Sequence, residues 1–465
     1  MKKQLVILSA AAMVAAAAVP ALALENEFHG MFLTQGISSN LNNGTTGPVA
    51  VSQANLALDK TFVDQRARLQ YIAKANDDLK LVTHFEFDGR WGDNSYSGGA
   101  RNSGLALGAD STSIEVKSVY LDFNIPGAPV NAKVGMQGLN DAYKGVFVGN
   151  DAAGALLTTK LGAATVSTGW FRFDDARAAG QALGKTTRDF TLLDGSFAVS
   201  KDVKVGASYY YYFDDNAALS GTGTGIFAGN GKGEQQIHML GVNGAATFGP
   251  ATLDGFFLYQ DGVIRNSAFT SKHLSAFAAN VGAKVNVGPG AVKTSFLYTS
   301  GSDCKNANAD GCVGKNSFIS AQNETSSAYM ESGVFSGANS ILIFRGNSYR
   351  TSNTDQSIVS DPSNKGTGIA AAFVGYDGAI NKLFFNTNAA FVANAKKQYT
   401  AGTYKNKSQY LGSEINAEVG YKLYDNLRAS VQGAYVFLGP AFSHTDGTTY
   451  AKAPYLGRVI LSYTF

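Results

Sequence analysis

The C-terminal segment 455–465 is the feature that most constrains the fold of this chain. Its residues alternate between an apolar and a polar face with the period of two that is typical of a β-strand. The apolar face carries Tyr455, Gly457, Val459, Leu461, Tyr463 and Phe465, and the polar face carries Arg458, Ser462 and Thr464. An apolar face that continues to the terminal residue suits a strand whose outer side contacts lipid. We therefore predict that this segment is the closing strand of a membrane barrel.

The N-terminal residues 1–23 have the pattern of a secretory signal peptide. Two lysines precede an apolar run from Leu5 to Val19, and Ala21-Leu22-Ala23 offers a small-residue cleavage site. A membrane anchor helix is the less favoured interpretation, because the run is short and rich in alanine. We predict an exported chain whose mature part, residues 24–465, is one transmembrane domain.

Composition and charge support an all-β membrane protein. Only 16% of the residues are charged, and the formal net charge is +3, which gives no reason to expect nucleic acid as a partner. No second apolar run is long enough for a spanning helix, whereas apolar residues recur at alternate positions from about residue 28 onward. A single closed β domain is the simplest interpretation.

Two neighbouring segments show how the faces separate. In the first, Ala67, Leu69 and Tyr71 alternate with Arg66, Arg68 and Gln70, and in the second, Leu81, Phe85 and Phe87 alternate with His84, Glu86, Asp88 and Arg90. A soluble sandwich would bury the apolar side, whereas a membrane barrel turns it outward. The period alone does not distinguish these two folds.

The connections distinguish them. Tight turns such as Asn76-Asp77-Asp78 and Gly288-Pro289-Gly290 alternate along the chain with long polar stretches such as 214–234 and 302–366. This order predicts an antiparallel transmembrane β-barrel of about 18 strands, or alternatively about 16, with short periplasmic turns and long extracellular loops.

Together these features resemble a Gram-negative outer-membrane porin over the whole mature chain. The resemblance implies a bacterial outer-membrane location and a C-terminal signal, made of Val459, Leu461, Tyr463 and Phe465, that the barrel-insertion machinery reads. It implies an inward-folded constriction loop at about 139–153. By analogy with porins of this size, a homotrimer is possible.

The predicted pore-lining residues come from the inward faces and from this loop. They are Arg66, Arg68, Gln70, His84, Glu86, Arg90, Asp122, Asp141, Lys144, Asp151, Arg172, Glu414, Arg428 and Arg458. Opposite charges across a water-filled lumen create a transverse field that discriminates solutes by charge. Two plainer interpretations stay open: the loop charges lie on an ordinary surface loop, and Arg66 and Arg68 merely pair with Glu86 or Asp88.

Other candidate sites are weaker. Trp170, Tyr210 and Tyr212 could form an aromatic sugar track, although an interfacial aromatic girdle explains them better. Cys304 and Cys312 are the only cysteines, and in an exported chain we predict that they form a disulfide. The loop between them resembles only half of a calcium loop, so we predict no metal and no cofactor. No local motif proposes a catalytic triad, and we predict no enzyme activity.

We therefore predict a porin for the passive diffusion of small hydrophilic solutes and ions. Two alternatives remain. One is a substrate-selective channel, and the other is a structural or accessory barrel that supports surface proteins or respiratory partners.

Overall fold

The fold is known from a computed structural model of the chain. It describes residues 24–40, 60–94, 104–108, 114–175, 183–184, 187–215, 233–266, 269–303, 315–321, 335–344, 357–359, 361–397, 408–442 and 453–465. The predicted signal peptide, Cys304 and Cys312 lie outside these residues.

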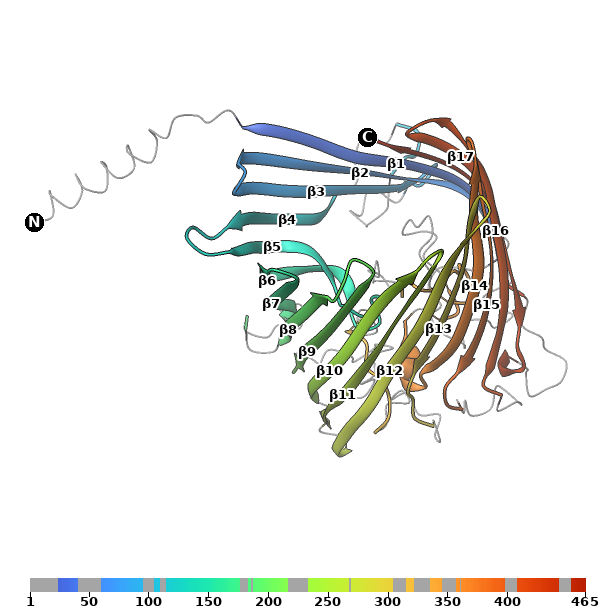
Figure 1. The fold of residues 1–465 in the computed structure, drawn as a ribbon. Coiled ribbons are helices and arrows are strands. Elements are labelled where there is room, and N and C mark those ends of the chain that lie inside the picture. Colours follow the sequence, from blue (N-terminus) through green and yellow to red (C-terminus); the bar gives the residue numbers. More distant parts are fainter. Residues whose placement is uncertain are drawn as a thin grey trace, which may run out of the picture.

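Strands account for most of the described chain (Figure 1). They are β1 (Glu25–Ser39), β2 (Lys60–Asn76), β3 (Leu79–Arg90), β4 (Glu115–Asn124), β5 (Val130–Asn140), β6 (Gly149–Leu161), β7 (Ala164–Asp175), β8 (Thr187–Ala198), β9 (Val203–Asp214), β10 (Gly233–Phe248), β11 (Ala251–Asn266), β12 (Phe269–Val287), β13 (Gly290–Thr299), β14 (Ile369–Ile380), β15 (Leu383–Asn394), β16 (Tyr410–Tyr424), β17 (Leu427–Leu438) and β18 (Tyr455–Thr464). Two short 3-10 helices, η6 (Asn364–Gly366) and η7 (Pro440–Phe442), lie in the connections before β14 and β18.

The sheet closes on itself. Each strand pairs antiparallel with its neighbours in the sequence, and β1 pairs with β18, from Met31 opposite Thr464 to Ser39 opposite Leu456. The predicted closed antiparallel barrel is confirmed, and its sheet contains 18 strands among the residues that the structure describes. Closure satisfies the backbone groups that an open edge would expose to hydrocarbon. No helix among the described residues is long and apolar enough to cross a membrane, which says nothing of a β-barrel.

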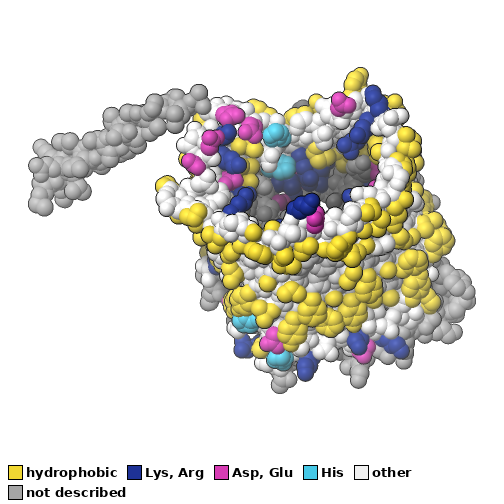
Figure 2. Space-filling view, in the orientation of Figure 1, with side chains coloured by type: hydrophobic (Ala, Val, Ile, Leu, Met, Phe, Trp, Pro, Cys, Tyr) yellow, Lys and Arg dark blue, Asp and Glu magenta, His cyan; other side chains and the backbone are white. Residues whose placement is uncertain are grey.

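The outer surface is apolar, as the sequence predicts. Val459 and Phe465 on β18 and its C-terminus are 62% and 51% exposed, and Leu240 on β10 is 61% exposed. Figure 2 shows the resulting band of hydrophobic side chains on the outer face of the barrel that is in view. A soluble protein would bury such a band, so the barrel fold and the exposed band together exclude the sandwich interpretation.

The interior differs from the expected water-filled lumen. On β8 to β11 the inward positions include large apolar side chains that are completely buried, namely Phe190, Tyr210, Tyr212, Ile237, Met239 and Leu258. They form one apolar cluster with connecting segments that lie inside the barrel, and these segments include 141–148, 315–321 and 335–344. Part of the interior is therefore dry, because chain segments cover an inner wall that water would otherwise contact.

Candidate pore constriction

The connection between β5 and β6, residues 141–148, leaves the barrel wall, and we call it the tip. β5 and β6 stay paired up to Asn140 opposite Gly149, whereas the pairing of β4 with β5 ends at Val119 opposite Met136. The tip is held in shape by Asp141, whose carboxylate accepts backbone N–H bonds from Tyr143, Gly145, Phe147 and Val148 at 2.8, 2.8, 2.7 and 2.9 Å. Burial raises the pKa of this carboxyl to about 6, because loss of solvation outweighs the four donors.

Two aromatic residues of the tip pack against the inner wall. The ring of Tyr143 lies 5.7 Å from that of Tyr210 on β9 and 5.5 Å from that of Phe256 on β11. The ring of Phe147 lies 5.4 Å from that of Phe190 on β8. Tyr143 and Phe147 are fully buried. The tip 141–148 therefore lies inside the barrel and covers the inner faces of β8, β9 and β11.

Segments of the connection between β13 and β14 pack onto this tip. The hydroxyl of Ser320 and the backbone N–H of Ala321 both donate to the carbonyl of Phe147, at 3.1 and 3.0 Å. The N–H of Ser336 donates to the carbonyl of Lys144 at 2.9 Å. On the wall, the amide of Gln260 bonds both the carbonyl and the N–H of Ile319, at 2.7 and 2.9 Å. We call the tip 141–148 together with segments 315–321 and 335–344 the inner plug.

Glu414 on β16 anchors the inner plug and does not line water, which corrects its predicted role. Its carboxylate accepts the backbone N–H groups of Ile341, Leu342 and Ile343 at 2.8, 2.8 and 2.7 Å. The side chain is completely buried. Asp141 needs the same correction, since it is buried and satisfied by its own loop. Both carboxylates satisfy N–H groups of irregular backbone that would otherwise be buried unpaired.

Charged side chains remain partly exposed beside the tip. Asp151 pairs with Lys117 of β4 at 2.8 Å, and Lys144 pairs with Asp254 of β11. His84 on β3 is half-buried and lies opposite Ser118 of β4, next to Lys117 in the chain. The structure thus brings Asp151 of β6 to Lys117 of β4, and it joins Lys144 of the tip to Asp254 of β11.

The arginines of β2 are paired with carboxylates of β3. Arg66 contacts Asp88 through two bonds of 2.7 and 2.6 Å and Glu86 at 3.1 Å. Arg68 also pairs with Glu86. Of the two interpretations that the sequence left open for these arginines, the structure shows wall ion pairing.

The other predicted residues are dispersed along the barrel. Arg458 is buried and donates to Gln432 and Gln35. Gln70 lies opposite His84 in the register of β2 and β3, and Arg90, at the long-loop end of β3, pairs with Asp93 at 3.2 Å. Asp122 and Arg428 lie on the inner wall near the tight turns.

Arg172 lies on the outer face of β7, so its prediction as a pore-lining residue is wrong. It shares its face of β7 with Trp170, which is 45% exposed, whereas the intervening Phe171 is completely buried. The guanidinium lies 5.3 Å from the centre of the Trp170 ring and bonds Asp189 at 2.9 Å. Phe171 points inward because the inner plug gives it an apolar environment, and this turns Trp170 and Arg172 outward. The aromatic track is wrong for the same reason, since Tyr210 and Tyr212 are buried and Trp170 lies outside. The favoured interpretation, an interfacial girdle, is also wrong for Tyr210 and Tyr212, because a girdle faces outward.

Sequence reasoning missed Lys117, Asp254 and the plug segments. Asp254 alternates with Leu253, which is 49% exposed, so its inward direction could have been read from the pattern. Lys117 lies where the pairing of β3 with β4 shifts register, and such a shift interrupts the alternation. Nothing local in segments 315–321 and 335–344 signals that they enter the barrel.

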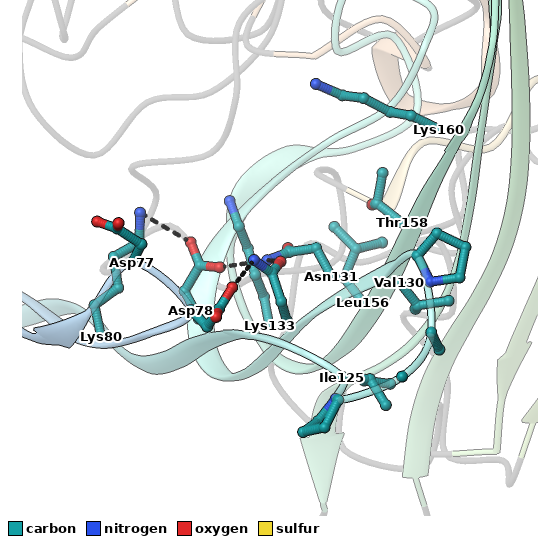
Figure 3. Close-up of a pocket in the computed structure, with 16 residues that line it drawn as sticks. Asp77, Asp78, Lys80, Ile125, Val130, Asn131, Lys133, Leu156, Thr158 and Lys160 are labelled. Carbon is teal, nitrogen blue, oxygen red and sulfur yellow. Dashed lines mark hydrogen bonds and ion pairs between the residues drawn. The ribbon is translucent and has the colours of Figure 1, made fainter.

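A cavity of about 990 Å³ lies at the tight-turn end (Figure 3). Its lining comes from β3 to β6 and includes Lys80, Asp122, Lys133 and Lys160. Asp122 bonds Asn131 at 2.8 Å and pairs with Lys80 at 3.4 Å.

Comparison with known proteins identifies the fold. No family model matches the chain, and no curated protein matches it. Three solved structures are similar over nearly their whole length: Acinetobacter baumannii OccAB2 (TM-score 0.54, 9% identity, covering 95% of this chain and 98% of that one), the outer membrane protein opdK from Pseudomonas aeruginosa (0.53, 10%, 95% and 98%) and Pseudomonas aeruginosa OpdL (0.52, 12%, 95% and 99%). At this identity the likeness shows the fold alone, so the predicted resemblance to an outer-membrane β-barrel is confirmed for the fold.

Proposed function

We propose that this outer-membrane barrel is a passive channel that selects among small hydrophilic solutes. The observation that carries the proposal is the inner plug, whose Tyr143 and Phe147 are completely buried against the wall. A plug that fills one side of the lumen leaves a narrow path, and a narrow path discriminates solutes more strongly than an open barrel. The plug therefore favours the selective alternative over a general diffusion porin.

The narrowest part of the path is proposed to lie beside the tip 141–148. Lys117 of β4 and Asp151 of β6 form one partly exposed charge pair there, and Lys144 of the tip forms another with Asp254 of β11. Their partly exposed charges, in a region of low dielectric, act on a passing solute more strongly than the same charges in bulk water. No covalent chemistry is required of any of them.

Three partners belong to the same proposal. The outward residues Val459, Leu461, Tyr463 and Phe465 are proposed as the signal that the barrel-insertion machinery reads, and association into homotrimers is proposed by analogy alone. Outer-membrane lipid is the third partner, which follows from the exposed apolar band.

Single-channel conductance in planar bilayers tests the proposal. The double variant Tyr143→Ala and Phe147→Ala removes the aromatic contacts that hold the tip on the wall. We expect the wild type to conduct weakly for a barrel of this size and the variant to conduct severalfold more. The matched control, Tyr211→Ala and Phe257→Ala, removes two aromatic side chains that face outward, and it should conduct like the wild type.

A large wild-type conductance that the plug variant leaves unchanged would show instead an open general porin. A wild-type barrel that inserts but carries no current would support the accessory-barrel alternative.

A further inference from the structure

The inner wall carries a layer of cations at one end of the barrel. Its members lie on inward positions and within four residues of a tight turn: Lys74, Lys80, Lys133, Lys160, Lys204, Lys284, Lys293, Lys422 and Arg428. They come from β2, β3, β5, β6, β9, β12, β13, β16 and β17, and thus from most of the circumference. We call this layer the mouth ring. In Figure 2, Lys and Arg side chains are visible inside the hollow mouth of the barrel.

Strand alternation gives the direction of these side chains. Lys204 shares its face of β9 with the buried Ser208 and Tyr210, while Val205 next to it is 43% exposed on the outside. Likewise, Lys422 shares its face of β16 with Glu418, which is 4% exposed. Alternation places these ammonium groups in the lumen, where the end of the barrel opens to water.

Most of the mouth ring has no carboxylate partner within the described part of the chain. Lys74 pairs with Glu25 at 3.0 Å, Lys80 with Asp122 at 3.4 Å, and Lys293 with Asp377. Among the residues that the structure describes, no ion pair is formed by Lys133, Lys160, Lys204, Lys284, Lys422 or Arg428. Lys133 instead lies 5.7 Å from the centre of the Tyr120 ring. Figure 3 shows Lys133 and Lys160 beside the mouth cavity with no dashed contact between them and a carboxylate.

The register even places cations opposite each other. Lys422 is the cross-strand neighbour of Arg428, and Lys284 is that of Lys293. Like charges that lie directly opposite destabilise a sheet. Some acidic residues at this end of the barrel form no ion pair with the ring. Among the described residues they lie mainly on the turns, as do Asp202 and Asp425, or on β1, where Glu27 lies 3.5 Å from His29.

The charges deeper in the barrel contrast with this layer. Arg66 and Arg68 are compensated by Asp88 and Glu86, and Lys117 by Asp151. Lys144 of the tip is compensated by Asp254, which lies near the level of the mouth ring on β11. The excess of positive charge on the described inner wall therefore lies at the mouth and not beside the tip.

We propose that the mouth ring makes the channel selective for anions. It does so by raising the concentration of small mobile anions, such as chloride or inorganic phosphate, at the tight-turn opening. The inference rests on the proposed channel function and assigns its charge selectivity to a different layer from the constriction. Tight turns face the periplasm in outer-membrane barrels, so the ring acts at the periplasmic opening. Because it lies at one end only, it should also make the current depend on the direction of the applied voltage.

Salt concentration provides a signature of this mechanism. The charges are exposed to water, where the Debye length is about 10 Å at 0.1 M salt and about 3 Å at 1 M. A field that extends across the mouth at low salt is confined close to each ammonium group at high salt. The anion preference and the asymmetry of the current should therefore be clear at about 0.1 M and weak at about 1 M.

The test is a reversal-potential measurement in a potassium chloride gradient. The variant Lys204→Gln with Lys284→Gln removes two unpaired members of the ring. The matched control, Lys201→Gln with Lys382→Gln, removes two lysines on the tight turns themselves at the same end. We expect the ring variant to lower the ratio of anion to cation permeability by about two- to fourfold at low salt, since one charge about 10 Å away in water changes a local ion concentration about twofold. The control should lower the ratio much less, because its two lysines lie on the turns, where water screens them more completely than inside the lumen.

The outcomes separate this inference from the channel proposal. A conducting ring variant with the wild-type permeability ratio and the wild-type current asymmetry would overturn the inference and leave the channel intact. A wild-type protein without conductance would instead overturn the channel. If a heat-modifiability gel shows that the first variant does not assemble, the variant Lys160→Gln with Lys422→Gln tests the same inference, because it removes two other unpaired ring lysines, on β6 and β16.

Discussion

At the residue scale, carboxylates act here mainly as acceptors for irregular backbone. Asp141 binds four N–H groups of its own loop, and Glu414 binds three of a segment more than 70 residues away. Neither faces a permeating solute. Charged residues on an inward face are therefore of two kinds, those that hold the inner plug and those that meet water.

Replacing Asp141 with Ala tests whether a buried carboxylate holds the inner plug in place. The variant leaves four buried N–H groups without their acceptor, so we expect a loss of about 3 kcal/mol or more in unfolding free energy, in line with the cost of unsatisfied buried groups. We also expect more open-channel noise, because the tip loses its fixed shape. Thermal unfolding followed by heat-modifiability on gels measures the first effect, and single-channel recording measures the second.

The exposed turn residue Asp202 supplies the control, as Asp202→Ala removes a carboxylate that holds no loop inside the barrel. Equal stability and equal noise in the two variants would contradict the anchoring role of Asp141.

At the element scale, β18 shows how alternation places a strand between lipid and lumen. Val459 is 62% exposed on the outside, and its neighbours Arg458 and Ile460 are 3% and 1% exposed on the inside. The inward Ile460 shows that the inner face is not uniformly polar. The strand keeps its register against both β17 and β1, which fixes the outer face along its whole length.

A lysine scan of β18 tests this assignment. Leu461→Lys places a charge on the lipid side, and we expect a cost of roughly 2–4 kcal/mol if the site lies near the midplane of the bilayer, and less near an interface. Ser462→Lys places the same charge on the lumen side and should cost much less. Folded fractions in lipid vesicles over a denaturant series give both values. Equal costs at the two positions would show that the faces are wrongly assigned.

At the scale of the whole molecule, closure depends on a narrow seam between β1 and the C-terminus. Gly30 and Phe465 exchange two backbone hydrogen bonds, of 2.9 and 3.1 Å. A Cβ added at Gly30 would lie 2.5 Å from the carbonyl oxygen of Arg68 and 2.5 Å from the Phe465 ring. Glycine at this position therefore lets the terminal aromatic cover the seam.

Gly30→Ala should weaken the seam. We expect a loss of about 1–3 kcal/mol, as in other overpacked sites, and a lower temperature for the gel shift that marks the closed barrel. Gly36→Ala is the control, since Gly36 also lies on β1 and a Cβ there would meet nothing within 4 Å. A gel-shift temperature lowered equally by both substitutions would attribute the effect to glycine loss in general and not to the seam.

The sequence by itself determined the strands, their outer faces, the alternation of tight turns with long connections and the closing position of 455–465. These features are local, because the period of two and the turn chemistry act between residues close in the chain. Arg66 and Arg68 could be placed inward on that basis alone.

Only the tertiary structure decided what the interior contains. Alternation tells which residues point inward, but it does not tell whether water or another segment meets them, as Phe171, Tyr210 and Glu414 show. The inner plug is built from contacts between distant parts of the chain, such as Phe147 with Ser320. The mouth ring has the same origin: a chain of net charge +3 shows no basic patch in its sequence, and the cations come together because the register of closed strands brings every tight turn to one end.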